Sequence, residues 1–179
     1  MTMRYLRSLE RPWYFVVTAT TRQRRPGEQD GVDYIFLEQE LFQEMVRKGE
    51  FLEYAQVYGR WYGVPRAQVK EALQRGLDVF IKVDVQGAAT IKKVAPDGVF
   101  IFLAPPSLEE LERRLRQRKT ESEKDMEVRL ATARREMEQL PLYDHVVVND
   151  NDRLQETVTR IDAIVTDERR KAQPRRIHL

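Results

Sequence analysis

The hydrophobic residues of the first half of the chain follow two patterns. Runs of aromatic and β-branched residues, such as Trp13 to Ala19, predict strands. Apolar residues at helical spacing that end at a glycine, such as Leu41 to Val46 before Gly49, predict helices. We therefore expect strands over 13–19, 34–37 and 50–58, helices over 1–10, 39–48 and 65–75, and the beginning of a turn at 61–63.

The second half of the chain alternates strand and helix patterns. Asp78 to Asp84 is mostly apolar, which is typical of a strand buried on both faces, and Ser107 with Glu110 forms a capping box that predicts a helix start. We expect strands over 78–84, 99–103 and 145–148, and helices over 87–94, 107–118, 122–139 and 154–170. Because strands that alternate with helices imply right-handed crossovers and a parallel sheet, the predicted fold class is α/β.

Composition excludes several classes of function. With 179 residues the chain is expected to form one domain, and a net charge of +2 gives no reason to expect binding to nucleic acid or to a membrane. The sequence contains no cysteine, so disulfides, thiolate metal ligands and a cysteine nucleophile are excluded, and the two distant histidines do not suggest a zinc site. No apolar run is long enough for a membrane span and no signal peptide begins the sequence, so we expect a cytoplasmic protein.

The chemistry of the chain is concentrated in a basic turn. Arg22 and Arg25 lie beside Pro26 and Gly27, and Tyr34 follows closely. Guanidinium groups match phosphate oxygens with paired donors, so this turn is a candidate phosphate site, although an isolated pair of arginines in a turn is usually only a solvated surface. No segment of the sequence reads G-x-x-x-x-G-K-[ST], the loop that binds a nucleoside triphosphate.

Seven motifs in order resemble the guanylate kinase family, which transfers the terminal phosphoryl group of ATP to GMP. The resemblance covers about 13–170, and the motifs lie at 20–28, 30–34, 50–53, 62–63, 83–87, 104–107 and 148–150. It implies a parallel sheet like that of the P-loop nucleoside monophosphate kinases, with helices on both faces. It also implies one domain over 1–179, with a small mixed-β GMP-binding subdomain over about 20–77, a helical lid over about 113–138 and a core made of the remainder.

The resemblance assigns a GMP site. Arg22 and Arg25 would grip the GMP phosphate with help from the Tyr34 and Tyr62 hydroxyls, and Glu53 would accept hydrogen bonds from guanine, whose N1–H and amine lie side by side. Without the resemblance, the sequence favours an outward-facing strand residue as the interpretation of Glu53. Asp84 would lie near the phosphates and magnesium, and it also suits the N-cap of the next helix. The residues implied to bind GMP are Thr18, Arg22, Arg25, Tyr34, Glu53, Tyr62 and Asp84.

The resemblance also implies an ATP side. Arg114, Arg118 and Arg129 match lid arginines that neutralise charge on the transferring phosphoryl group, and together with Asp84 they are the candidate catalytic residues. For most arginines of this region, a solvated helix face near a helix C-terminus is the preferred interpretation. Asn149 and Asp150 match a loop near the ATP adenine, or form a simple polar turn. The implied partners are GMP and ATP, with Mg²⁺ accompanying ATP.

Three features depart from the family pattern. Lys82 stands where an acidic residue is common, and Val64 stands where a Ser or Thr hydroxyl often helps to hold guanine. The third is the region before Met3, where about 20 residues with a strand and the phosphate loop are expected. We expect that the printed start is internal to the gene, which the upstream codons would test, and that the printed chain binds GMP but turns over very slowly.

Two other functions stay open at this stage. Guanylate-kinase-like domains of scaffold proteins have lost catalysis and bind phosphorylated peptides on the GMP side, so the chain could be such a binding module. It could also transfer phosphoryl groups to another nucleotide, although Glu53 favours guanine. Comparing GMP binding with phosphopeptide binding would separate the first of these alternatives from the enzyme.

Overall fold

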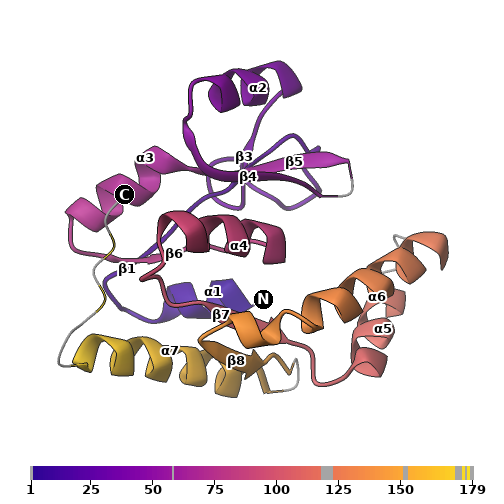
Figure 1. Cartoon of the computed structure of the whole chain (residues 1–179). Coiled ribbons are helices and arrows are strands. Elements are labelled where there is room, and N and C mark those ends of the chain that lie inside the picture. Colours follow the sequence, from indigo (N-terminus) through magenta and orange to yellow (C-terminus); the bar gives the residue numbers. More distant parts are fainter. Residues whose placement is uncertain are drawn as a thin grey trace. The chain divides into compact units, whose positions relative to one another are not determined.

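The computed structural model describes residues 2–57, 59–117, 123–150 and 153–171, together with Arg175 and Ile177. Figure 1 shows the helices and strands of the chain. Contacts between residues divide the chain into two compact units. Unit 1 comprises Met1–Leu9 and Gly98–Arg176, and unit 2 comprises Glu10–Asp97 and Ile177–Leu179.

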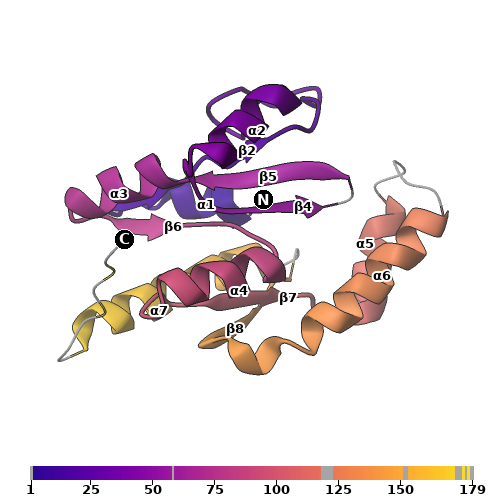
Figure 2. The same ribbon diagram turned by 45° about the horizontal axis from the view of Figure 1, so that its top comes forward.

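Unit 2 contains a four-stranded mixed sheet in the order β3-β2-β5-β4. Its strands are β2 (Ala19–Thr20), β3 (Ile35–Phe36), β4 (Phe51–Val57) and β5 (Arg60–Pro65). β2 pairs in parallel with β3, and β5 pairs antiparallel with both β2 and β4. Helix α2 (Gln39–Arg47) covers one face of this sheet and α4 (Val85–Val94) lies on the other, as Figures 1 and 2 both show.

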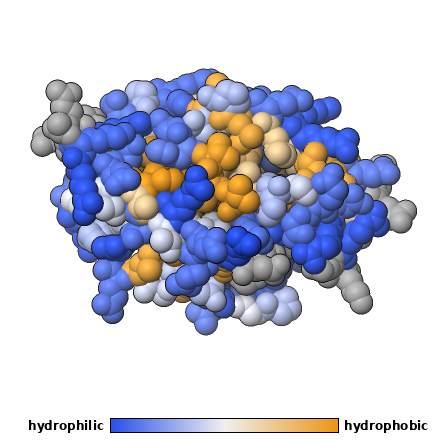
Figure 3. Space-filling model, turned by 90° about the horizontal axis from the view of Figure 1, so that it is seen from below, coloured by the Kyte–Doolittle hydropathy of each residue, from blue (hydrophilic) through white to orange (hydrophobic). Residues whose placement is uncertain are grey.

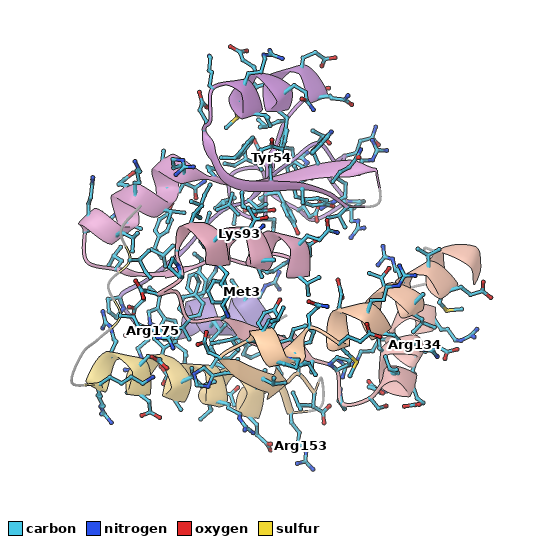
Figure 4. The ribbon with its side chains drawn as sticks, in the orientation of Figure 1. Met3, Tyr54, Lys93, Arg134, Arg153 and Arg175 are labelled. Atoms are coloured by element: carbon cyan, nitrogen blue, oxygen red, sulfur yellow. The ribbon has the colours of Figure 1, made fainter. Side chains whose placement is uncertain are left out.

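Aromatic packing builds the core on the α2 face of the sheet. Phe42 of α2 is fully buried, and its ring stacks on Phe51 at a centroid distance of 4.6 Å and on Trp61 at 6.0 Å. Tyr54, labelled on β4 in Figure 4, packs against the same two rings of the sheet. The helical spacing of the apolar residues in 39–48 therefore serves to place one buried phenyl ring on the sheet.

A β-bulge in β4 sends Glu53 to the opposite face. The register shifts between Phe51, which pairs with Pro65, and Glu53, which pairs with Val64. A bulge adds one residue to a strand and so reverses the side on which the following side chains point. Glu53 consequently turns toward α4, where a Cβ on Gly87 would stand only 2.9 Å from its Oε1 atom.

The rest of unit 2 is a parallel pair of strands with one helix. β1 (Trp13–Phe15) pairs in parallel with β6 (Asp78–Phe80), and aromatic rings of both strands lie in contact. α3 (Arg66–Gln74) begins after Pro65 and buries Val69. The amide of Gln68 in α3 bonds both the N–H and the C=O of Val17, which ties this helix to the chain between β1 and β2.

Unit 1 is a second parallel pair with helices. Its elements are α1 (Thr2–Ser8), β7 (Ile101–Ala104), α5 (Leu108–Gln117), α6 (Glu123–Met137), the 3-10 turn η1 (Leu140–Leu142), β8 (His145–Val148) and α7 (Leu154–Arg170). β7 and β8 pair in parallel, and α7 packs against α1 and β8. The most deeply buried residues are Leu6, Val147 and Val158. Ser107 caps α5 by accepting a hydrogen bond from the N–H of Glu110 at 3.2 Å.

The α/β class and the parallel pairing are confirmed, and three local predictions are wrong. The predicted turn at 61–63 is part of β5, because Trp61 and Tyr62 favour a strand and Gly63 makes room for the Phe51 ring instead of bending the chain. The strand predicted over 13–19 is interrupted between β1 and β2. The strand predicted over 78–84 ends at Phe80, before Lys82 and Asp84.

Some apolar side chains remain on the surface. The space-filling view shows apolar residues gathered on one face (Figure 3). In the β7–β8 pair, the exposed large apolar residues are Leu103, Val146 and Val148. None of the helices in the described part of the chain has the length and apolar character that crossing a membrane requires.

Candidate nucleotide site

The basic turn of unit 2 is organised by an internal ion pair. Arg22 Nη2 donates to Glu28 Oε1 at 2.8 Å, and Arg22 Nη1 donates to the carbonyl oxygen of Gln23 at 2.7 Å. The second oxygen of Glu28 accepts from the backbone N–H of Arg25. The hydrogen bond with Arg22 lowers the pKa of Glu28, and the bond to Glu28 raises the pKa of Arg22. The turn is therefore held in one shape before any ligand binds.

Two tyrosines and a lysine surround this guanidinium. Arg22 Cζ lies 5.2 Å from the centroid of the Tyr34 ring, and the Tyr34 and Tyr62 rings meet edge to face at 6.1 Å. The Tyr62 phenol also raises the pKa of Arg22. Lys82 Nζ lies 3.5 Å from the Tyr34 hydroxyl oxygen. Hydroxyl, guanidinium and ammonium donors thus converge, which is the donor set that a phosphate requires.

A buried acid forms the other end of the candidate site. Glu53 is only 5% exposed, and no described residue donates a hydrogen bond to its carboxylate. Burial, followed by repulsion from Asp84, raises the pKa of Glu53 to about 7. Asp84 is the N-cap of α4, because its Oδ1 accepts from the N–H of Gly87 at 2.8 Å. The N-cap role predicted for Asp84 is thereby confirmed.

Both ends lie on one face of the four-stranded sheet. Tyr62 pairs with Ala55, and Val64 pairs with Glu53. Because paired residues and residues two apart along a strand share a face, the side chains of Tyr62 and Glu53 point to the same side. The segment after β6 joins the two ends, since it brings Lys82 to Tyr34 and Asp84 to Glu53.

Two of the residues predicted to bind GMP, Arg25 and Thr18, contribute backbone bonds, and Val64 contributes packing. The side chain of Arg25 is exposed, whereas its backbone joins the turn: its N–H donates to Glu28 Oε2, and its carbonyl oxygen accepts from the N–H of Glu28. Thr18 precedes β2, and its carbonyl oxygen accepts from the N–H of Ile35. Val64, where the resemblance leads one to expect a Ser or Thr hydroxyl, is fully buried and contributes packing.

In unit 1, Arg114 is fixed by two partners. Its Nε donates to Glu110 Oε1 at 2.7 Å and its Nη1 donates to the carbonyl oxygen of Asn149 at 2.9 Å. Hydrogen bonds from Arg113 and Arg114 lower the pKa of Glu110 to about 2. Since the Glu110 carboxylate holds these arginines, it does not complete the predicted capping box. Arg114 is 14% exposed, whereas Arg113 is 58% exposed, so the two neighbours differ in role.

The other residues predicted for the ATP side are Asn149, Asp150, Arg129 and Arg118. Asn149 accepts from the Thr2 hydroxyl at 3.3 Å, and the carbonyl oxygen of Asp150 accepts from the N–H of Arg153. Both residues directly follow β8. Arg129 lies on α6 and is partly buried, and Arg118 lies outside the described residues.

Within the described ranges no group of three or more His, Asp or Glu side chains could hold a metal ion. Magnesium commonly keeps several waters and binds through substrate phosphates with one or two carboxylates, so a three-ligand protein cage is not required for it. Asp84, beside Glu53, is the carboxylate that fits such a supporting role.

Comparison with known proteins settles the family. The family model described as guanylate kinase matches residues 3–168. The chain belongs to the guanylate kinase family. A guanylate kinase of Clostridioides difficile is 46% identical over 155 residues, which are 87% of this chain and 75% of that protein. A guanylate kinase of Bacillus cereus is 49% identical over 154 residues, or 86% of this chain and 74% of the relative.

A solved structure supports the fold. The crystal structure of guanylate kinase from Anaplasma phagocytophilum matches with a TM-score of 0.82 and 33% identity, and the match covers 98% of this chain and 84% of that one. The fold of a guanylate kinase, predicted from the seven motifs, is therefore confirmed.

Sequence reasoning missed two participants in the site. Glu28 pairs with Arg22, and Gly87 makes room for Glu53. Glu28 lies in the motif at 20–28 and Gly87 in the motif at 83–87, but the sequence does not show which side chains contact each other in the fold. The spacing of Arg22 and Glu28 across a Pro-Gly turn was the one available signal for the first.

Proposed function

We propose that this guanylate kinase family member transfers the γ-phosphoryl group of ATP to GMP, giving ADP and GDP. The observation that carries the proposal is Glu53, a buried carboxylate that no described residue pairs. An unpaired buried acid is costly, and a ligand that offers adjacent N–H donors removes that cost. Guanine offers them at N1 and at its exocyclic amine, whereas adenine has no N1–H donor, which gives the site its proposed base specificity.

The phosphate of GMP is proposed to bind at the basic turn. Arg22, Tyr34 and Tyr62 already converge there, and the exposed Arg25 side chain is close enough in sequence to fold over an anion. Since Glu28 already orients Arg22, less freedom is lost when the phosphate arrives. Thr18 and Asp84 are proposed to complete the GMP site, as the resemblance implies.

The reaction follows from holding the two nucleotides in line. An oxygen of the GMP phosphate attacks the γ-phosphorus of ATP, a new P–O bond forms, and the bond to the β–γ bridging oxygen breaks to release ADP. We propose that Arg114, Arg118 and Arg129 neutralise the charge on the transferring group, and that Asn149 and Asp150 lie near adenine. Magnesium would arrive with the ATP phosphates and neutralise their charge when bound.

The division of labour along the chain is proposed as well. The GMP-binding subdomain is assigned to about 20–77, the lid to about 113–138 and the core to the remainder. A phosphopeptide-binding role would need the basic turn but would give no purpose to an unpaired Glu53. We therefore favour the enzyme, acting in purine nucleotide metabolism.

The proposal is tested by binding and by turnover. We expect calorimetry to show GMP binding with at least 100-fold weaker AMP binding, and a coupled assay of this chain to show slow ADP formation that depends on GMP. Arg22→Met should weaken GMP binding by about 100-fold, whereas the matched control Arg24→Met, an exposed residue of the same turn, should change it less than twofold. Equal binding of GMP and AMP would refute the proposed specificity.

A further inference from the structure

Lys82 is the one residue of the candidate site whose charge departs from what the family pattern predicts. It follows β6 in a segment without regular secondary structure, and its side chain is exposed. Its Nζ atom lies 3.5 Å from the Tyr34 hydroxyl oxygen and 5.8 Å from the centroid of the same ring. The ammonium therefore meets the ring that also lies beside Arg22.

The two cations at this ring differ in how they are balanced. Arg22 forms an ion pair with Glu28 at 2.8 Å, so much of its charge is neutralised within the turn. Lys82, in contrast, forms no ion pair with any carboxylate of the described residues. The positive charge that an incoming anion meets at Tyr34 thus comes in large part from Lys82.

Lys82 also sets the direction of a hydrogen bond. An ammonium has donors only, so the Tyr34 oxygen must accept from it. When that oxygen accepts from Lys82, the phenolic O–H is left to donate elsewhere, and a phosphate oxygen is a suitable acceptor. An acid at this position would instead compete for the phenolic proton.

We propose that Lys82 is a phosphate-binding residue of this chain, which adds charge for the nucleotide monophosphate and positions the Tyr34 hydroxyl to donate to it. The inference rests on the proposed GMP site and deepens it. It assigns to Lys82 a contribution that depends on the phosphate and is independent of the base.

The test compares GMP with guanosine, which lacks the phosphate. In the full chain, Lys82→Met should weaken GMP binding about fivefold at low salt and leave guanosine binding unchanged, and Lys82→Arg should restore most of the loss. At 0.5 M NaCl the effect of Lys82→Met should fall below twofold, because salt screens an exposed charge. Lys70→Met, which removes an exposed lysine of α3, is the matched control and should have no effect.

The outcomes separate the two proposals. If wild type binds GMP and Lys82→Met binds it equally well, or loses GMP and guanosine affinity alike, the role of Lys82 is refuted and the GMP site stands. If wild type binds no GMP, both proposals fail. A double-mutant cycle with Tyr34→Phe examines the positioning step, for which we expect the two losses to be non-additive, and additive losses would overturn that step.

Discussion

Two buried glutamates, one in each unit, have nearly the same exposure and opposite electrostatics. Glu53 of unit 2 is 5% exposed, and Glu168 of unit 1 is 7% exposed. Glu168 is surrounded by basic side chains: Lys171 Nζ lies 2.6 Å away, and His145 Nε2 and Arg175 Nε each lie 3.3 Å away. Hydrogen bonding, above all from Lys171, lowers the pKa of Glu168, whereas burial raises the pKa of Glu53 to about 7.

The difference shows that pairing, and not burial, decides whether a buried acid is stabilised or destabilised by its surroundings. Glu168 has its partners within unit 1, where Arg175, labelled in Figure 4, also bonds Asp144 and the carbonyl oxygen of Gly98. These bonds fasten the end of the described chain. Among the described residues, the charged group that acts on Glu53 is Asp84, which repels it. Its environment is unfavourable until a donor arrives, which is what a specific ligand can exploit.

The largest expected effect is on base selectivity. Glu53→Gln keeps the size of the side chain but replaces one acceptor with a donor that opposes the guanine N–H groups. We expect the ratio of GMP to AMP affinity to fall by roughly 10²-fold or more. Calorimetric titration with both nucleotides measures it. Glu168→Gln is the matched control and should leave the ratio unchanged. If Glu53→Gln still prefers GMP to AMP as strongly as wild type, Glu53 does not recognise guanine.

The same two variants should shift stability in opposite directions. At pH 8, Glu53→Gln removes an unfavourable buried charge and should raise the free energy of unfolding by roughly 1–3 kcal/mol. Glu168→Gln removes the acid that pairs with Lys171 and Arg175 and should lower the free energy of unfolding by about 1–2 kcal/mol. Urea denaturation monitored by circular dichroism measures both values. Shifts of the same sign in the two variants would contradict the comparison.

Sequence reasoning predicted the elements well where the pattern was long and periodic, such as α7 and α2, and less well where packing decided. β5 was missed because Gly63 looks like a turn residue, while its actual role is to admit the Phe51 ring. The bulge before Glu53 has no signature in the sequence, so the face on which Glu53 points could not be predicted. The pairing of Arg22 with Glu28 depends on the shape of a turn, which spacing alone does not determine.

The pH dependence of binding provides a third test. Glu53 has a pKa of about 7 in the folded chain, so it is about half protonated at pH 7, and guanine requires the ionised form. GMP binding at pH 7 should therefore release about half a proton from Glu53, with a small further release from the nucleotide phosphate, whose second pKa is about 6. Calorimetry in two buffers of different ionisation enthalpy measures the release. Release near zero would mean that Glu53 is already ionised.

The two acids also give opposite contributions to stability as pH changes. Because the folded pKa of Glu53 is raised, its contribution is present below the unfolded value of about 4.5 and is lost as pH rises to about 7. Because the folded pKa of Glu168 is lowered, its contribution is present above its unfolded value and is lost as pH falls through the folded one. Affinity for GMP should be about tenfold lower at pH 6 than at pH 9 from Glu53 alone.

The smallest expected effect comes from the glycine that faces Glu53. A Cβ at Gly87 would stand 2.9 Å from the carboxyl carbon and Oε1 of Glu53, and 2.9 Å from Val83 Cβ, so Gly87→Ala should push the carboxylate aside. We expect GMP affinity to fall about three- to fivefold and the free energy of unfolding to fall by about 1 kcal/mol. Gly49→Ala is the control: its φ of 67° strains an alanine and costs similar stability, but no atom lies within 4 Å of its Cβ. Both variants should lose stability, but only Gly87→Ala should lose GMP affinity. If neither variant loses GMP affinity, displacing the Glu53 carboxylate has no effect on guanine binding, and the proposed role of its position is wrong.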